Sequence, residues 1–138
     1  MRSWIMRTIG LTAFIGIVAV APAAAENATA KSGEKTEITT HMKYDTRCQA
    51  NRVTIRITQA PQNGTLTSEP KILVVPAGME RGMPQQSPCV GKTMDGIAVY
   101  YQSNPGFVGE DRFRYQRLNP RDPGDPFNKE ISYMVKVE

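Results

Sequence analysis

The chain has 138 residues, of which 40% are hydrophobic and 22% are charged. That length allows one domain with its own core and leaves no room for a second. Lys and Arg number 17 against 13 Asp and Glu, so the net charge is +4. This excess is mild and evenly spread, which argues against a nucleic acid or an anionic membrane as the partner.

The first 25 residues have the pattern of a secretory signal peptide. Arg2 and Arg7 precede an apolar run from Ile9 to Val20, and three alanines at 23–25 offer a cleavage site before Glu26. The run is shorter than the roughly 20 apolar residues that cross a bilayer, and an uncleaved N-terminal anchor is the alternative. We therefore predict an exported bacterial protein, periplasmic or secreted, with a net charge of +2 after cleavage and no stable membrane insertion.

Residues 26–34 combine Ala, Thr, Ser, Gly and charged residues without apolar periodicity, so we expect a flexible N-terminal tail there. The domain itself is expected over 35–138, beginning with an edge strand at 35–42. The clearest alternation follows at 52–59. It predicts that Val53, Ile55 and Ile57 face the core and that the residues between them face water.

A turn is predicted at Pro61-Gln62-Asn63-Gly64, and its Asn-Gly pair between extended segments favours a β-hairpin. Residues 65–68 begin the return strand, and 71–75 form another apolar run that Pro76 ends. Residues 76–92 carry three prolines and three glycines and show no periodicity, which predicts a long loop.

A strand, a corner and a second strand are predicted over residues 96–118. In the corner, Asn104-Pro105-Gly106 supplies the φ values of a type II turn. Phe107, Phe113 and Tyr115 are expected in the core, and Asp111 is expected to accept backbone N–H groups at the turn. A proline-rich second loop at 119–129 precedes the last strand, 131–137, in which alternate residues point inward.

Cys48 and Cys89 are the two cysteines of the sequence. In an oxidising compartment an even pair predicts a disulfide, which here would close a loop of about 42 residues. The alternatives are a reactive thiol and a metal ligand. Both lack suitable neighbours, because no Cys-x-x-Cys is present and the only histidine stands seven residues upstream of Cys48.

Two short motifs resemble the repeat of bacterial immunoglobulin-like or cadherin-like β-sandwich domains: Pro-Gly-Phe-x-Gly-x-Asp-x-Phe-x-Tyr at 105–115 and Pro-x-x-Gly-Thr-Leu at 61–66. The resemblance covers about residues 38–137. It implies an all-β fold, namely an immunoglobulin-like antiparallel sandwich of about seven strands. It implies no particular activity, because such sandwiches serve many unrelated functions.

The sequence lacks the inventory of an enzyme. It has one histidine and no phosphate-binding glycine loop, and the turn explains its Glu110-Asp111 carboxylate pair. We therefore predict neither catalysis nor a cofactor. One alternative is a periplasmic copper carrier, because His41, Met42, Met79 and Met83 are ligand types that suit Cu(I). No His-x-His or Met-x-x-Met cluster supports that alternative.

Surface recognition is the function that this sequence favours. Loops at the ends of a β-sandwich carry binding residues on a rigid scaffold, and two long loops are predicted here. The second contains Arg117, Arg121 and Phe127, residue types that are enriched at interfaces. We predict an exported, non-enzymatic module that binds a protein or cell-envelope component through its loops. A small inhibitor of an extracellular hydrolase, inserting one loop into the enzyme cleft, is a further alternative.

Overall fold

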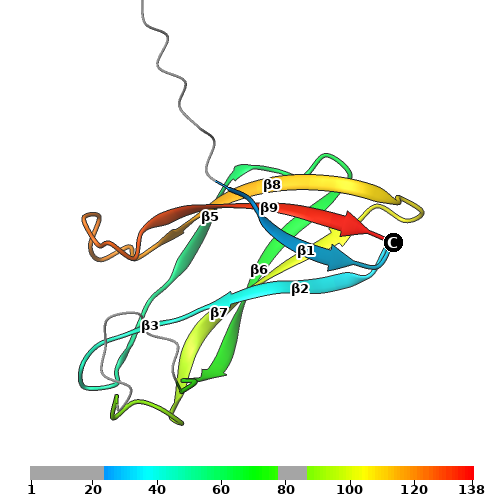
Figure 1. Cartoon of the computed structure of the whole chain (residues 1–138). Coiled ribbons are helices and arrows are strands. Elements are labelled where there is room, and N and C mark those ends of the chain that lie inside the picture. Colours follow the sequence, from blue (N-terminus) through cyan, green and yellow to red (C-terminus); the bar gives the residue numbers. More distant parts are fainter. Residues whose placement is uncertain (1–23, 78–86) are drawn as a thin grey trace, which may run out of the picture.

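The structure, a computed structural model, describes residues 24–77 and 87–138 of the chain. Within these ranges the chain is all-β and contains no helix, so the described part offers no helical segment able to cross a membrane (Figure 1). The predicted signal peptide lies almost wholly outside the described residues and stays a prediction. The strands are β1 (Glu26–Ala30), β2 (Lys35–His41), β3 (Lys43–Tyr44), β4 (Ala50–Asn51), β5 (Thr54–Gln59), β6 (Gly64–Val74), β7 (Thr93–Ser103), β8 (Gly109–Leu118) and β9 (Lys129–Val137).

Two sheets face each other and enclose the core, with a small hairpin at one end (Figure 1). The first sheet has the order β1-β9-β8-β5 and the second has the order β2-β7-β6. The hairpin pairs β3 with β4. Neighbouring strands run antiparallel, except that β1 runs parallel to β9. This layered arrangement confirms the predicted all-β class.

A stack of aromatic rings fills the centre of the core. Phe113 is fully buried, and its ring centroid lies 5.4 Å from that of Tyr133 and 6.0 Å from that of Tyr101. Tyr115, also fully buried, stacks on Tyr133 from the same sheet. Offset stacking of this kind contributes about 0.5–1.5 kcal/mol per pair beyond the burial of apolar area. The core also contains the inward residues of the last strand, as predicted: Ile131, Tyr133, Val135 and Val137.

The corner between β7 and β8 is the turn that the sequence predicts. The Phe107 amide donates to the Asn104 carbonyl at 3.1 Å, and Gly106 adopts a φ of 80°, as the third residue of a type II turn requires. The chain thereby passes from one sheet to the other. Phe107 packs against the edge of the core, whereas Phe113 and Tyr115 lie inside it.

Asp111 ties this corner to the connection between β5 and β6. Its buried carboxylate accepts the amides of Gln62 at 3.0 Å and Asn63 at 2.9 Å, together with the hydroxyl of Tyr101 at 3.0 Å. The prediction that Asp111 accepts backbone N–H groups is confirmed, and most of those groups come from a segment about 50 residues away. The aspartate is therefore a cross-link between two distant turns.

The predicted hairpin at Asn63-Gly64 is wrong. Strand β5 belongs to the four-stranded sheet and β6 to the three-stranded one, so residues 60–63 cross between the sheets. Gly64 has a packing role instead: an added Cβ would lie 2.5 Å from the Gln102 carbonyl oxygen and 2.8 Å from the Tyr101 ring. Only glycine lets β6 approach β7 this closely.

Two further expectations about strands need correction. Residues 65–68 and 71–75 were predicted as separate segments, yet β6 runs unbroken through Pro70. Ile57 was predicted to face the core, yet it is 46% exposed, and Ile55 is only partly buried. Strand β5 is the edge of its sheet, and an alternating pattern cannot reveal how far the opposite sheet extends over such an edge.

The predicted flexible tail is also wrong. Residues 26–30 form β1, which pairs with β9 along its whole length, from Glu26 opposite Tyr133 to Ala30 opposite Val137. Ala30 is buried, and the Ser32 amide donates to the Glu138 carbonyl at 2.8 Å. Small alanines at alternate positions suit a strand laid against the side of the core, but they produce no apolar signal in the sequence.

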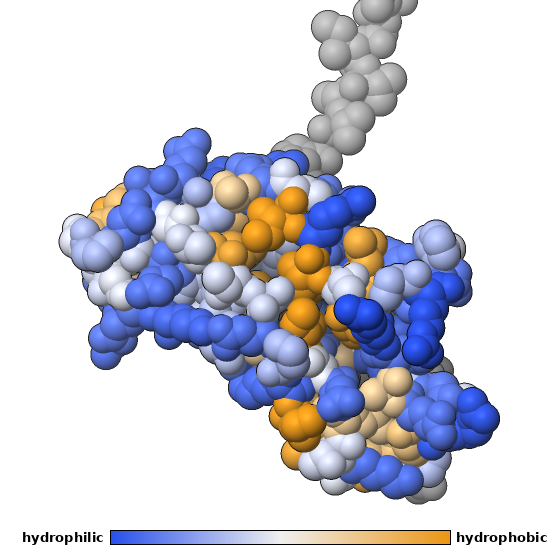
Figure 2. All heavy atoms as spheres, turned by 180° about the vertical axis from the view of Figure 1, so that it is seen from behind, coloured by the Kyte–Doolittle hydropathy of each residue, from blue (hydrophilic) through white to orange (hydrophobic). Residues whose placement is uncertain are grey.

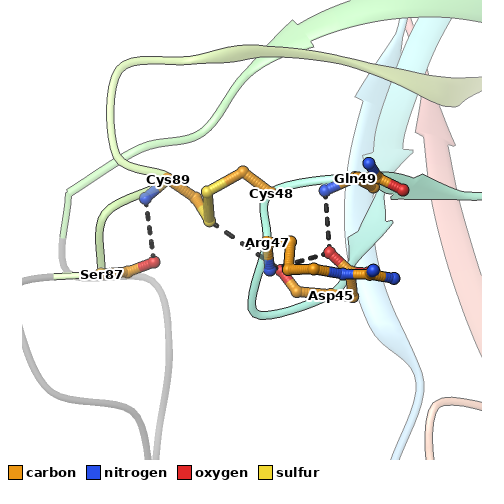
Figure 3. The surroundings of a disulfide bond; sticks show 6 residues. All are labelled: Asp45, Arg47, Cys48, Gln49, Ser87 and Cys89. Carbon is orange, nitrogen blue, oxygen red and sulfur yellow. Dashed lines mark hydrogen bonds and ion pairs between the residues drawn. A yellow bond between two sulfur atoms is a disulfide. The ribbon is translucent and has the colours of Figure 1, made fainter.

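The predicted disulfide between Cys48 and Cys89 is confirmed, with a Cα–Cα distance of 5.3 Å (Figure 3). It anchors the β3–β4 hairpin to the segment that precedes β7. A second, smaller hydrophobic cluster surrounds it, built from Val75, Cys89 and Met94 with Met42, Tyr44 and Cys48 packed alongside. Asp45 shapes the hairpin turn by accepting the amides of Arg47 and Gln49 through one carboxylate oxygen.

Candidate functional site

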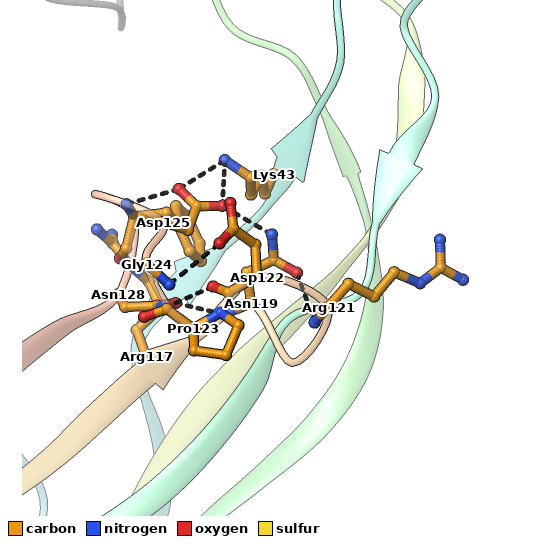
Figure 4. Close-up of polar contacts among 10 residues, drawn as sticks. Lys43, Arg117, Asn119, Arg121, Asp122, Pro123, Gly124, Asp125 and Asn128 are labelled. Carbon is orange, nitrogen blue, oxygen red and sulfur yellow. Dashed lines mark hydrogen bonds and ion pairs between the residues drawn. The ribbon is translucent and has the colours of Figure 1, made fainter.

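The loop between β8 and β9 is an ordered polar network rather than an open connection (Figure 4). Asp125 is its centre: the carboxylate accepts the Asn119 side-chain amide at 2.7 Å and the Phe127 backbone amide at 2.9 Å. Lys43 of β3 adds an ion pair at 2.8 Å. These donors, with the Asn119 amide foremost, hold the pKa of Asp125 down at about 2. The network fastens the loop to the β3–β4 hairpin.

Of the three residues predicted as an interaction surface, two are used inside this loop. The Arg117 guanidinium lies 4.0 Å from the centroid of the Phe127 ring, and its Nε donates to the Phe127 carbonyl at 3.1 Å. Both side chains are half-buried. Arg121 is different, because it is exposed and points away from the network in Figure 4. The structure therefore leaves Arg121 as the predicted loop residue available to a partner.

Arg121 lies at an open cleft of about 710 Å³. One wall is the segment from β4 into β5, including Arg52 and Val53, and the other is formed by inward-facing positions of β6 and β7. A smaller hollow of about 250 Å³ continues beyond it and shares Ala50 and Asp95 with the cleft. Cys48 and Ile72 line this hollow, so the disulfide-bonded hairpin forms part of the same recess. Its size is in the range of ordinary ligand sites.

The recess combines apolar surface with positive charge. Ile72, which lines the hollow, is 64% exposed, and Val74, two residues further along β6, is 59% exposed. Hydrophobic residues also form a band down the middle of the face of the molecule shown in Figure 2. The cleft is lined by two arginines, Arg52 and Arg121, and one acid, Asp95. Among the described residues neither guanidinium has a carboxylate within ion-pair distance. Exposed apolar side chains beside unpaired cations are typical of a binding surface.

His41 is a core residue. It is 8% exposed, and its Nε2 lies 2.8 Å from the Tyr115 hydroxyl. Burial, assisted by the nearby charge of Arg117, lowers the pKa of His41 to about 4, so the imidazole is neutral at physiological pH. Burial also raises the pKa of Tyr115 above its ordinary value.

The copper alternative gains no geometric support from this arrangement. Met42 packs in the second hydrophobic cluster, whereas His41 contacts Tyr115 of the main core. Met79 and Met83 lie outside the described residues. Within 24–77 and 87–138, no group of three or more His, Cys, Asp or Glu side chains is arranged to hold a metal ion.

Sequence reasoning missed Arg52 and the cleft itself. Arg52 falls in the stretch 52–59 that was predicted as a strand; it is exposed but lies between β4 and β5, and its exposure does not reveal what it faces. The cleft brings together residues 50–55, 68–70, 95–97 and Arg121, and no motif links those four segments. The only signal in the sequence was the apolar run at 71–75, which was predicted as an extended segment with no binding role.

The chain is an all-β, sandwich-like protein with one disulfide. No family model matches it, and no curated protein matches it significantly in sequence. A solved structure described as "Solution Structure of Amebosin" is similar over 81% of this chain and 88% of that chain, at 12% identity and a TM-score of 0.42. A likeness of that degree carries no argument about family or function, so both rest on the residues of this chain.

Proposed function

We propose that this chain is an exported, non-enzymatic binding module with an immunoglobulin-like fold. The export signal at 1–25 supports the location, periplasmic or secreted. The strand order supports the fold: β5, β8 and β9 correspond to strands C, F and G of an immunoglobulin domain, and β2, β7 and β6 to strands B, E and D of the opposite sheet.

The module binds a protein or another component of the cell envelope in the cleft between β4–β5 and β6–β7. The observation that carries this proposal is that Arg52 and Arg121 both line the cleft without an ion pair among the described residues, while the exposed Ile72 lines the adjoining hollow. The role of the 119–129 loop is to position Arg121 at that cleft through the Asp125 network. The burial of the one histidine against Tyr115 supports a non-enzymatic role, because it removes His41 as a general base at the surface.

Site-specific photocrosslinking tests this assignment. A photoreactive amino acid replaces Val53, which lines the cleft beside Arg52, in one variant and Val108, which is 67% exposed in the β7–β8 corner, in a matched control. Both variants keep Arg52 and Arg121, and both are produced in the native host and irradiated. We expect a discrete crosslinked product from the Val53 variant alone. Identical products from both variants, or none from either, would contradict binding at the cleft.

A further inference from the structure

Among the described residues, no strand pairs with the outer edge of β6. Strand β6 ends the order β2-β7-β6, so its far side has no described strand beside it. The bonds at the two ends of the β6–β7 ladder fix which residues face β7. The Val75 amide donates to the Lys92 carbonyl at 2.9 Å, and the Asn63 carbonyl accepts the Asn104 amide at 2.7 Å. The register between them has no shift.

Residues of an antiparallel strand alternate between facing the partner strand and facing away from it. Since residues 63 and 75 face β7, the odd-numbered residues of β6 complete the ladder and the even-numbered ones turn their backbone outward. Pro70 fits this assignment, because a residue without an N–H costs no ladder bond at an outward position. The amides of Ser68, Ile72 and Val74 therefore point to the open edge.

The same even-numbered residues direct their side chains toward the recess. Ser68 and Pro70 line the larger cleft, and Ile72 lines the smaller hollow. One stretch of β6 thus offers free hydrogen-bonding groups along its edge and apolar side chains on its inner face. Across the cleft, Arg52 and Val53 fall between β4 and β5 and belong to no strand. Strand addition is the recognition mode that uses both properties.

We propose that the edge of β6 from Ser68 to Val74 takes up an extended acidic peptide segment as an added strand. This proposal rests on the proposed function and specifies its ligand. Side chains of the added strand alternate between the recess and the outer face. Those in the recess are carboxylates where they lie beside Ser68 and Pro70, near Arg52 and Arg121, and apolar where they lie beside Ile72 and Val74.

Charge selects a peptide over a second copy of the chain. The β6 side chains that line the recess are Ser68, Pro70 and Ile72, all uncharged, and Val74 follows on the same face of the strand. Pairing of two β6 edges would therefore cover Ile72 and Val74 but bring no further carboxylate to Arg52 and Arg121, which share a cleft with a single acid, Asp95. An acidic segment covers the apolar surface, pairs with the backbone edge of β6 and supplies carboxylates to both arginines.

The probe is the peptide Ac-Val-Thr-Val-Thr-Glu-Thr-Glu-NH2, with its sequence-reversed form to cover both strand directions. The matched control replaces both Glu by Lys. Binding to the chain without its predicted signal peptide, residues 26–138, is monitored through NMR chemical-shift changes of the backbone amides. We expect saturable changes at the amides of Ser68, Ile72 and Val74, with affinity at least tenfold higher for an acidic form than for its Lys counterpart.

Two variants separate backbone pairing from charge. Ile72→Pro removes one outward amide without touching the ladder to β7, and should abolish binding, whereas Ile72→Ala keeps that amide and should weaken binding only several-fold. The double variant Arg52→Glu/Arg121→Glu should reverse the preference in favour of the Lys peptide. Retention of full acidic-peptide affinity by Ile72→Pro in a folded chain would overturn strand addition.

Several other outcomes would refute peptide binding at β6 or change its occupant. No saturable change with any peptide up to millimolar concentration, or equal affinities for the Glu and Lys forms, would refute the proposal. Changes at the same amides on raising the protein concentration alone would make the occupant a second copy. If the Val53 photoprobe captures a partner while the peptides fail to bind, the proposed binding at the cleft is retained and strand addition is refuted. If the photoprobe also fails, the proposed function itself is wrong.

Discussion

The buried neutral histidine should make this protein lose stability in a pH range where most carboxylates are still ionised. His41 packs against Tyr115 with 8% exposure, and its pKa is lowered from 6.5 to about 4. Below pH 6.5 His41 becomes protonated in the unfolded chain, whereas in the folded chain it stays neutral until about pH 4. The unfolded state binds more protons in this interval, so stability falls as the pH is lowered.

The size of the effect follows from the two pKa values. Each pH unit between them corresponds to about 1.4 kcal/mol, so lowering the pH from 7.5 to 4.5 should reduce the free energy of unfolding by about 2–3 kcal/mol. That is a large part of the roughly 5–15 kcal/mol that stabilises a small domain. Urea denaturation at intervals of half a pH unit measures the slope directly.

His41→Gln is the matched control, because its side-chain amide can still bond to the Tyr115 hydroxyl but does not titrate. We expect this variant to be less stable at pH 7.5 and to have a nearly flat stability between pH 6.5 and 4.5. A wild-type slope in this variant, or NMR showing that the His41 ring protonates near pH 6.5 in the folded protein, would contradict the assignment of His41 as the titrating group.

Three further contacts should each contribute measurably to stability. Asp111→Ala leaves three donors from Gln62, Asn63 and Tyr101 without their charged acceptor, so it should cost about 3–5 kcal/mol in urea denaturation; a loss below about 1 kcal/mol would show that water replaces the carboxylate. Reducing the Cys48–Cys89 disulfide releases a loop with a sequence separation of 41 and should cost up to about 4 kcal/mol, with Cys48→Ser/Cys89→Ser as control. Asp125→Asn should remove an acid-induced loss of stability between about pH 4 and pH 2, because the folded-state pKa of Asp125 is lowered to about 2; an unchanged acid limb would refute that assignment.

Local signals in the sequence predicted local structure well. Alternation alone placed Ile131, Tyr133, Val135 and Val137 in the core, and Asn104-Pro105-Gly106 defined its turn, because each depends on neighbouring residues only. The failures concern relations between distant segments. Glu26–Ala30 forms a strand because the side of β9 is free to accept it, and Ile57 is exposed because the facing sheet leaves it uncovered. Neither property can be predicted from the sequence of the segment alone, because each depends on a distant strand.

The candidate site shows the same limit more sharply. Arg117, Arg121 and Phe127 were selected by residue type, and residue type cannot show that Arg117 stacks on Phe127 while Arg121 is left free. Arg52 was missed because its importance comes from facing Asp95 and Pro70 across the cleft, far away in the sequence. The sequence predicted which residue types could bind a partner. It did not predict which of their charged groups are already engaged in contacts within the fold and which are not.

The Cys48–Cys89 disulfide also shapes the recess beside β6. Strands β6 and β7 extend to Val74 and Thr93, where Ile72 and Val74 remain more than half exposed. The β3–β4 hairpin, which is held by the Cys48–Cys89 bond, contributes to the same hollow, because Cys48 and Ala50 line it together with Ile72. A two-residue strand pair has too few bonds to hold this position alone. The disulfide therefore fixes one wall of the recess, and its reduction should weaken peptide binding at β6 even under conditions where the aromatic core stays folded.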